Sequence, residues 1–298
     1  MEFEDTNVSP ELAVNHHLND NMSIFFAYKE GFKSGGIDNS ALPTGMLRPA
    51  NPDFPGFLIY QSEEAEGFEV GMKGNFLDSA LRLNATLFTY EYSDLQVQLF
   101  NSSLINFQTF NASALETSGF EFDALWHTGI EGLTVRTAWA WTETEYSKDF
   151  INATSQNLKG ESGAGNAEVA GYVGFTLDLP MSGSWRYSFS ADTRYTGEYP
   201  WTATLNPFMQ DKFWLVDVAV SIYSDNGQHR FNLIGRNLGD EIYVIGGGAA
   251  PGRCVDYKPP AAMGALATCA EGPPANSLDQ NAITSLGRTV ALEYRFAL

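Results

Sequence analysis

Apolar and polar side chains alternate residue by residue in segments spread over the whole chain. In the segment Leu81–Leu87, apolar residues occupy the odd positions, while Arg82, Asn84 and Thr86 occupy the even ones. A period of two residues is typical of a β-strand with one apolar and one polar face, because successive side chains point to opposite sides. The pattern predicts eleven strands: Leu12–Leu18, Ile24–Tyr28, Phe68–Met72, Leu81–Leu87, Phe120–Trp126, Val135–Trp141, Val169–Leu177, Trp185–Ala191, Trp214–Val220, Phe231–Leu233 and Val290–Phe296.

The connections between these segments alternate between short and long. Short turns at one end and long loops at the other are typical of outer-membrane β-barrels, whose strands of roughly 9–11 residues cross the bilayer. We therefore expect an all-β, antiparallel transmembrane barrel with periplasmic short turns and extracellular long loops. The short connections are 19–21, 77–79, 128–132, 180–184 and 224–227. The long ones are 31–65, 147–165, 197–211 and 239–282, and the connection 100–110 is of medium length.

Composition supports an alternating barrel wall. Only 18% of the 298 residues are charged and 13% are aromatic, while the mean hydropathy is −0.19. The apolar face is expected to meet outer-membrane lipid and the polar face to line a wide, solvated lumen. The net charge of −19 argues against nucleic acid as a partner. The charged residues of the predicted polar face are Arg82, Glu121, Asp123, Arg136, Arg186, Asp192, Arg194, Arg230, Arg236 and Arg295.

The chain has two cysteines, Cys254 and Cys269, in a Gly-, Pro- and Ala-rich stretch of the last long loop. Two cysteines with no nearby histidine are too few for a zinc site. We predict a disulfide between them, which would contribute about 3 kcal/mol by restricting the unfolded chain. A disulfide also indicates an oxidising compartment, as an extracellular loop would provide.

Three stretches resemble one family of barrels. They are FFAYKEGFKSGGID (Phe25–Asp38), FNLIGRNLGDEIYV (Phe231–Val244) and GRTVALEYRF (Gly287–Phe296). The chain resembles the C-terminal half of a TonB-dependent outer-membrane receptor barrel, and the resemblance covers essentially residues 1–298. The residues that carry the first two signatures are Gly31, Phe32, Lys33, Ser34, Gly35, Gly36, Asn237, Leu238, Asp240 and Tyr243.

The resemblance implies more polypeptide than these residues. The family has a signal peptide, an energy-coupling box, a globular plug and a barrel of about 22 strands. Eleven strands are half of that number, and the acidic start Met1–Asp5 is unlike a signal peptide. We therefore expect residues 1–298 to be a barrel fragment from which the signal peptide, the plug and the first half of the barrel are missing.

The resemblance also implies a function, which is active uptake of a scarce nutrient, most often an iron–siderophore complex. The implied partners are this ligand, the TonB energy-transducing complex acting through a plug outside this chain, and the N-terminal half of the barrel. No cofactor is implied. Tyr199, Trp201, Arg253 and Tyr257 lie in or near predicted extracellular loops and are candidates for ligand contact, with loop packing as their alternative role.

Other functions stay open on the sequence. A passive porin or structural barrel shares the alternation, although shorter loops would suit it better, and a receptor fragment without function is a further alternative. An enzyme is not expected, because residues 160–164 (GESGA) depart from Gly-x-Ser-x-Gly at the last position and no catalytic constellation is present.

The polar segment Asn237–Asp240 interrupts an otherwise regular strand. Its position predicts a β-bulge near the outer rim, after which the strand resumes at Tyr243 and Val244.

Overall fold

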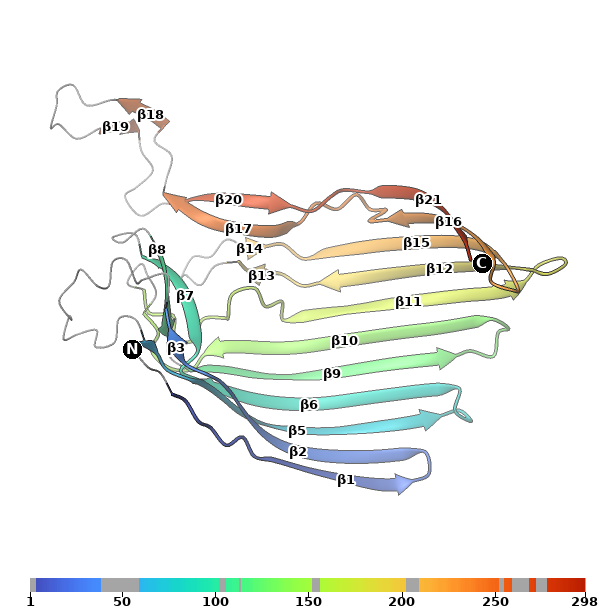
Figure 1. Ribbon diagram of the computed structural model, residues 1–298, viewed down its shortest axis with the longest axis horizontal. Coiled ribbons are helices and arrows are strands. Elements are labelled where there is room, and N and C mark those ends of the chain that lie inside the picture. Colours follow the sequence, from blue (N-terminus) through green and yellow to red (C-terminus); the bar gives the residue numbers. More distant parts are fainter. Residues whose placement is uncertain are drawn as a thin grey trace.

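One antiparallel sheet of eleven strands dominates the structure (Figure 1). The computed structural model describes residues 4–38, 59–101, 106–112, 114–151, 156–201, 209–251, 255–258, 268–271 and 278–297. The strand order follows the sequence, so the sheet is an up-and-down meander that is open between its two edges, β1 and β21. In order, the strands are β1 (Glu11–Asn19), β2 (Met22–Lys33), β5 (Glu63–Phe76), β6 (Leu81–Ser93), β9 (Leu115–His127), β10 (Leu133–Tyr146), β11 (Val169–Pro180), β12 (Trp185–Thr196), β15 (Phe213–Ser224), β16 (His229–Arg236) and β21 (Thr289–Phe296).

These strands confirm all eleven predicted segments and the alternation of short and long connections. The long connections carry five small hairpins, which gather at the end of the sheet opposite the short turns (Figure 1). The part of the chain that the structure describes contains no helix long and apolar enough to span a membrane. The hairpins pair β3 (Gly36–Ile37) with β4 (Ile59–Tyr60), β7 (Gln96–Asn101) with β8 (Asn106–Asn111), β13 (Tyr199–Pro200) with β14 (Met209–Gln210), β17 (Val244–Pro251) with β20 (Leu278–Thr284), and β18 (Val255–Lys258) with β19 (Thr268–Glu271).

The register places the apolar residues of neighbouring strands on the same face. Each member of a row lies directly opposite the next, so the alternation within single strands becomes one continuous apolar surface. Leu87 is 54% exposed and Trp141 is 50% exposed, and a soluble protein rarely leaves such a surface uncovered. One row runs through Val14, Phe26, Val70, Leu87, Phe120, Trp141 and Val169, and another through Leu179, Tyr187, Ile222, Phe231 and Tyr294.

The buried hydrophobic cluster lies among the long connections and not against the sheet. Tyr146 and Phe150 pack with ring centroids 5.0 Å apart, and Leu158 is fully buried beside them together with Ala112. A single sheet has no second layer on which to build a core, so burial concentrates where loops pack on one another. The connections β6–β9 and β10–β11 therefore form a compact wall at this end of the sheet.

Candidate functional site

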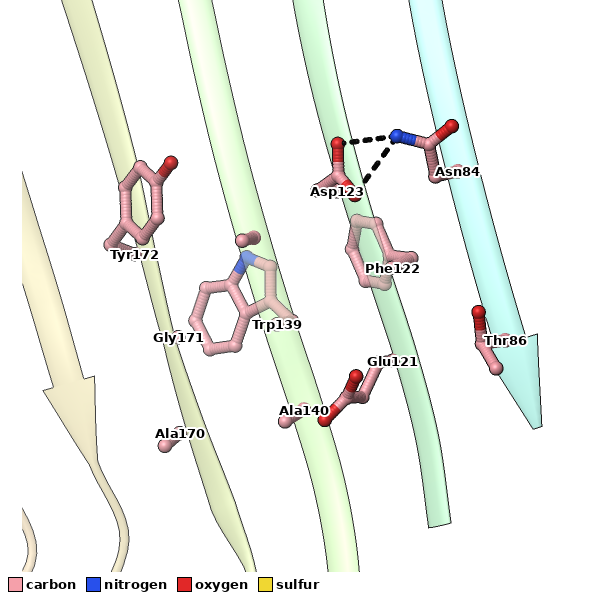
Figure 2. A pocket seen from close by; sticks show the side chains of 11 residues that line it. Asn84, Thr86, Glu121, Phe122, Asp123, Trp139, Ala140, Ala170, Gly171 and Tyr172 are labelled. Atoms are coloured by element: carbon pink, nitrogen blue, oxygen red, sulfur yellow. Dashed lines mark hydrogen bonds between the residues drawn. The ribbon is translucent and has the colours of Figure 1, made fainter. Parts of the chain in front are cut away.

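The polar face of the sheet is hollowed where small side chains meet (Figure 2). Ala140 lies directly opposite Ala170, and Thr86 and Asn84 face Glu121 and Asp123 across the strand pair. Because these alanine side chains are short, the surface is recessed there and a hollow of about 380 Å³ remains. Asn84 Nδ2 donates to both carboxylate oxygens of Asp123, at 3.1 and 2.9 Å. Among the described residues, no hydrogen bond or ion pair engages the Glu121 carboxylate, so this wall is acidic.

Ion pairs cross-link the polar face beside the hollow. Arg136 Nη2 lies 2.7 Å from Asp192 Oδ1, and Arg194 Nη2 lies 2.7 Å from Asp217 Oδ2. Asp192 and Asp217 are directly opposite each other on β12 and β15, so the two arginines offset a like-charge contact. All four side chains are at least a quarter exposed, so each pair contributes at most about 1 kcal/mol.

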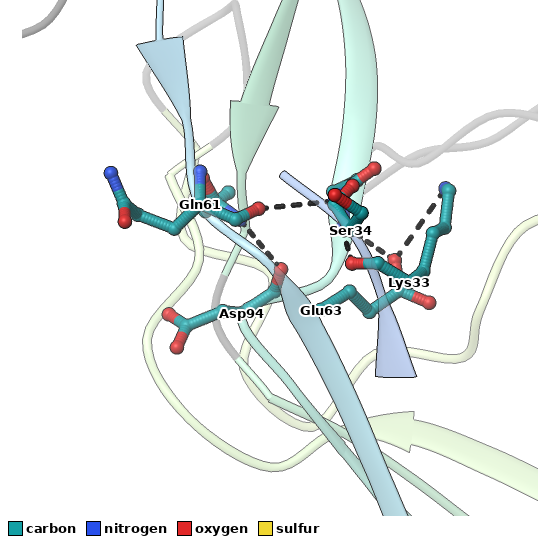
Figure 3. Close-up of polar contacts among 7 residues, drawn as sticks. Lys33, Ser34, Gln61, Glu63 and Asp94 are labelled. Carbon is teal, nitrogen blue, oxygen red and sulfur yellow. Dashed lines mark hydrogen bonds and ion pairs between the residues drawn. The ribbon is translucent and has the colours of Figure 1, made fainter. Parts of the chain in front are cut away.

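The first signature segment closes β2 and begins the β3 hairpin. Gly31–Lys33 are the last residues of β2, and Gly36 is the first of β3. The Gln96 side-chain amide donates to the carbonyl oxygens of Ser34 and Gln61, at 3.0 Å each. Lys33 Nζ lies 3.8 Å from the Glu63 carboxylate, in the network drawn in Figure 3. The segment is therefore a junction that fixes where the strand ends and the long loop begins.

Asp5 ties this junction to the segment before β1. Its Oδ2 accepts hydrogen bonds from Gly35 N at 3.0 Å and from Ser62 Oγ at 2.5 Å. These donors, Ser62 first and then Gly35, hold the pKa of the Asp5 carboxyl below its usual value. Neither Asp5 nor Gln96 was predicted from the sequence, because neither stands in a recognisable motif and their partners are distant in the chain.

The second signature segment joins the two ends of the last long connection. Asn237 adopts a left-handed backbone conformation with φ of 50°, which asparagine tolerates better than most residues. Its Nδ2 donates to Glu241 O at 2.7 Å and to Leu286 O at 3.3 Å, and its Oδ1 accepts from Glu241 N at 2.9 Å. Asp240 Oδ1 accepts from Arg288 N at 2.7 Å. Residues about 50 positions apart are thus held together.

The predicted bulge is only half right. Val218 pairs with Gly235, whereas Leu238 N donates to Val216 O, which is one residue out of that register. The extra residue is therefore present, but the strand does not resume in the sheet. β16 ends at Arg236, and β17 begins at Val244 and pairs with β20. The positive φ angles at Asn237 and Asp240 turn the chain away from the strand direction.

Two of the four predicted contact residues come together near the second signature. The rings of Tyr199 and Trp201 lie 5.7 Å apart, next to the β13–β14 hairpin. Burial, with a smaller contribution from the neighbouring Tyr243, raises the pKa of Tyr199 above its usual value. The signature Tyr243 stacks on Phe213, with centroids 4.4 Å apart and an interplanar angle of 11°. These four rings form an aromatic group where the long connections begin.

The remaining predicted residues fall on parts of the chain that are described incompletely or not at all. Arg253 and Cys254 lie outside the described residues. Tyr257 in β18 is opposite Cys269 in β19, with only their backbones described. The Cys254–Cys269 disulfide and the ligand contacts of Arg253 and Tyr257 therefore stay predictions.

Together, the up-and-down sheet, the exposed apolar face and the alternation of short and long connections identify the chain as part of the wall of a β-barrel. The family model for the TonB-dependent receptor-like β-barrel matches residues 2–238. The chain belongs to this family. Its members are transport receptors of the outer membrane, as the resemblance of the signature segments predicted.

Solved structures of receptors share the fold. The ferric yersiniabactin uptake receptor FyuA from Yersinia pestis matches 96% of this chain with a TM-score of 0.67 and 14% identity. The siderophore receptor PiuA from Acinetobacter baumannii matches 96% with a TM-score of 0.65 and 18% identity. The FrpB iron transporter from Neisseria meningitidis matches 97% with a TM-score of 0.61 and 16% identity.

The chain spans just over a third of the length of these structures, namely 36%, 35% and 39% of each. A search among curated proteins gave no match.

Proposed function

We propose that the chain is one wall of an outer-membrane receptor that takes up an iron–siderophore complex by TonB-dependent transport. The observation that carries the proposal is the division of the sheet into two faces, one apolar over all eleven strands and one polar. An open sheet with such faces suits a barrel in which lipid covers one side and a solvated lumen lies on the other.

The orientation follows from the loops. In barrels of this type the short turns face the periplasm and the long loops face outward. The two signature junctions and the packed connections at the long-loop end would then form part of the outer mouth. The aromatic group of Tyr199, Trp201, Phe213 and Tyr243 lies at this end. Phe213 is buried beneath Tyr243, whereas the partly exposed rings of Tyr199, Trp201 and Tyr243 offer apolar surface to a bulky ligand.

Structural relatives named for ferric siderophore or iron uptake support this choice of cargo, although their identity of 14–18% supports the shared fold and not a particular ligand. We propose that the rest of the barrel and a plug that contacts the TonB complex come from polypeptide outside these 298 residues. The plug would carry the coupling to the energy source.

Uptake of ⁵⁵Fe by cells that depend on the receptor containing this chain tests the proposal. Cells that express the receptor should accumulate ⁵⁵Fe from a ferric siderophore, and a protonophore should abolish the accumulation. Uptake that continues undiminished with the protonophore would point to a passive porin instead. Cells that take up no ferric siderophore, whichever one is supplied, would refute the iron cargo.

A matched pair of tryptophan variants tests the mouth. Trp201→Ala should raise the half-saturating concentration of the ferric complex, because it removes an aromatic surface at the long-loop end. Trp141→Ala is the control, since Trp141 is exposed on the apolar face, and it should leave the half-saturating concentration unchanged. Equal behaviour of the two variants would remove Trp201 from the ligand site.

A further inference from the structure

Three arginines and a tyrosine form one row across the polar face near the short turns. Arg186 on β12 lies opposite Tyr223 on β15, Tyr223 lies opposite Arg230 on β16, and Arg230 lies opposite Arg295 on β21. We call these four residues the arginine row. Arg186 and Arg230 are each the second residue of their strand, so the row lies at the short-turn end of the sheet.

Two of the three guanidinium groups have carboxylate partners. Arg186 Nη2 lies 2.7 Å from Asp178 Oδ1, and its Nε donates to the same oxygen at 2.8 Å. Arg295 Nε donates to the Glu293 carboxylate. Asp178 Oδ2 also accepts a hydrogen bond from the Tyr223 hydroxyl, so both of its oxygens have a partner. Asp178 and Glu293 are therefore already paired with Arg186 and Arg295.

Arg230 is the exception. Its guanidinium carbon lies over the Tyr223 ring, 4.3 Å from the ring centre, in a cation–π contact. Within the described ranges, Arg230 has no carboxylate partner. Its two direct cross-strand neighbours are Tyr223 and a second arginine, Arg295.

This arrangement leaves one positive charge unbalanced. Three guanidinium groups face two carboxylates, Asp178 and Glu293, and three minus two leaves one. Like charges directly opposite each other in a strand pair are destabilising. The planar guanidinium fork matches the oxygens of a carboxylate or phosphate, and a single oxyanion bound between two forks offsets their repulsion.

We propose that Arg230 and Arg295 bind one oxyanion, a carboxylate or a phosphate, on the polar face of the sheet. Because the apolar surface is on the opposite face, the ligand reaches the row from the lumen side. The oxyanion comes either from an acidic side chain of polypeptide that fills the lumen or from a free anion in the periplasmic opening. The proposed oxyanion site depends on the register of the strands and on the polar face of the sheet, and it does not depend on which ligand the receptor transports.

Titration of the complete barrel that contains this chain, folded in non-ionic detergent, tests the site. Citrate or inorganic phosphate, added at constant ionic strength, should shift the ¹⁵Nε–Hε NMR signals of Arg230 and Arg295. Arg230→Gln should weaken the binding by about tenfold or more, as loss of charge-assisted hydrogen bonds predicts. Arg230→Lys keeps the charge without the planar fork and should bind with intermediate affinity.

Arg236→Gln is the matched control. Arg236 lies on the same strand and face, but its cross-strand partner is Thr289, so this variant should bind the anion as the unchanged chain does. Equal weakening by Arg230→Gln and Arg236→Gln would show only general attraction of anions and would overturn the proposal. Absence of any shift at Arg230 would overturn it as well.

Labelling with phenylglyoxal, which modifies arginine, separates the two sources in washed membranes that contain the complete receptor. If a polypeptide carboxylate occupies the site, Arg230 should stay unreactive while Arg236 reacts. If a free anion occupies it, Arg230 should react after washing and be protected when phosphate is added. Reaction of Arg230 in both conditions would exclude the site in the assembled receptor. Uptake measurements do not enter this test, so the site and the proposed cargo fail or stand separately.

Discussion

Single polar residues hold together segments that are far apart in the sequence. Asn237 uses its backbone, its amide nitrogen and its amide oxygen to contact Asp217, Glu241 and Leu286. The residue is buried, so a lost partner would leave polar atoms without compensation. Its positive φ adds a conformational reason for asparagine at this position.

Replacement of Asn237 should therefore destabilise the last long connection. We expect Asn237→Ala to lower the free energy of unfolding in detergent by about 1–3 kcal/mol, from the lost hydrogen bonds and the strained backbone. Asn237→Gly removes the same hydrogen bonds but accepts the positive φ, so it should cost less than Asn237→Ala. Urea unfolding followed by tryptophan fluorescence measures both, and an unchanged midpoint for Asn237→Ala would contradict the assigned role.

Asp5 gives a residue-scale prediction for pH. The hydrogen bonds from Ser62 and Gly35 lower the pKa of Asp5 in the folded state. The contribution of Asp5 to folding stability is therefore fully present above the pKa of the unfolded state, and it is lost as the pH falls through the pKa of the folded state. The Gly35 amide signal should titrate with a midpoint below 3.8, the ordinary value for aspartate. Asp5→Asn should abolish this titration. A midpoint at or above 3.8 would refute the hydrogen bonding.

At the scale of the strand, the alternation of side chains decides which substitutions a strand tolerates. Leu87 and Thr86 are neighbours in the middle of β6, yet Leu87 belongs to the exposed apolar row and Thr86 lines the hollow of the polar face. A charge on the lipid side must leave water, whereas a charge on the lumen side stays hydrated.

These two positions form a matched test of the faces. Leu87→Arg should destabilise the complete barrel that contains this chain, folded in lipid vesicles, by about 2–4 kcal/mol, because it places a charge in the hydrocarbon region. Thr86→Arg should change the stability by less than about 1 kcal/mol. The measurement is the free energy of unfolding in urea with vesicles present. A larger cost for Thr86→Arg than for Leu87→Arg would reverse the assignment of the faces.

At the scale of the molecule, the sheet is open. Its edges, β1 and β21, are exposed along nearly their whole length, and each offers unpaired backbone groups to another strand. A closed barrel removes such edges, and in lipid every backbone group needs a partner. The 298 residues therefore need further strands, from the rest of a receptor or from another copy.

The open edges predict how the isolated chain behaves. Added alone to planar bilayers at low concentration, it should give no stable, discrete conductance, because a single sheet with two free edges encloses no pore. Sedimentation in detergent should show self-association that increases with concentration. A uniform conducting pore formed by single chains would show that the sheet closes by itself.

The sequence by itself determined the strands, their order of short and long connections, and the two faces. All three depend on local rules, because side chains alternate within a strand and turn lengths can be read directly. The signature segments also indicated the family, because their residues are contiguous in the chain. The bulge after Arg236 was only partly right, because the sequence shows a polar interruption but not the backbone angles that turn the chain.

Only the tertiary structure decided what lies opposite what. Register brings Arg186, Arg230 and Arg295 into one row, although they are spread over more than a hundred residues of chain. It likewise brings Asp5 to Gly35 and Gln96 to Ser34. The physical reason is that strand register depends on the pairing of whole strands, and a shift of one residue would move every side chain to the other face. The faces were therefore readable from the sequence, whereas the contacts across the strands were not.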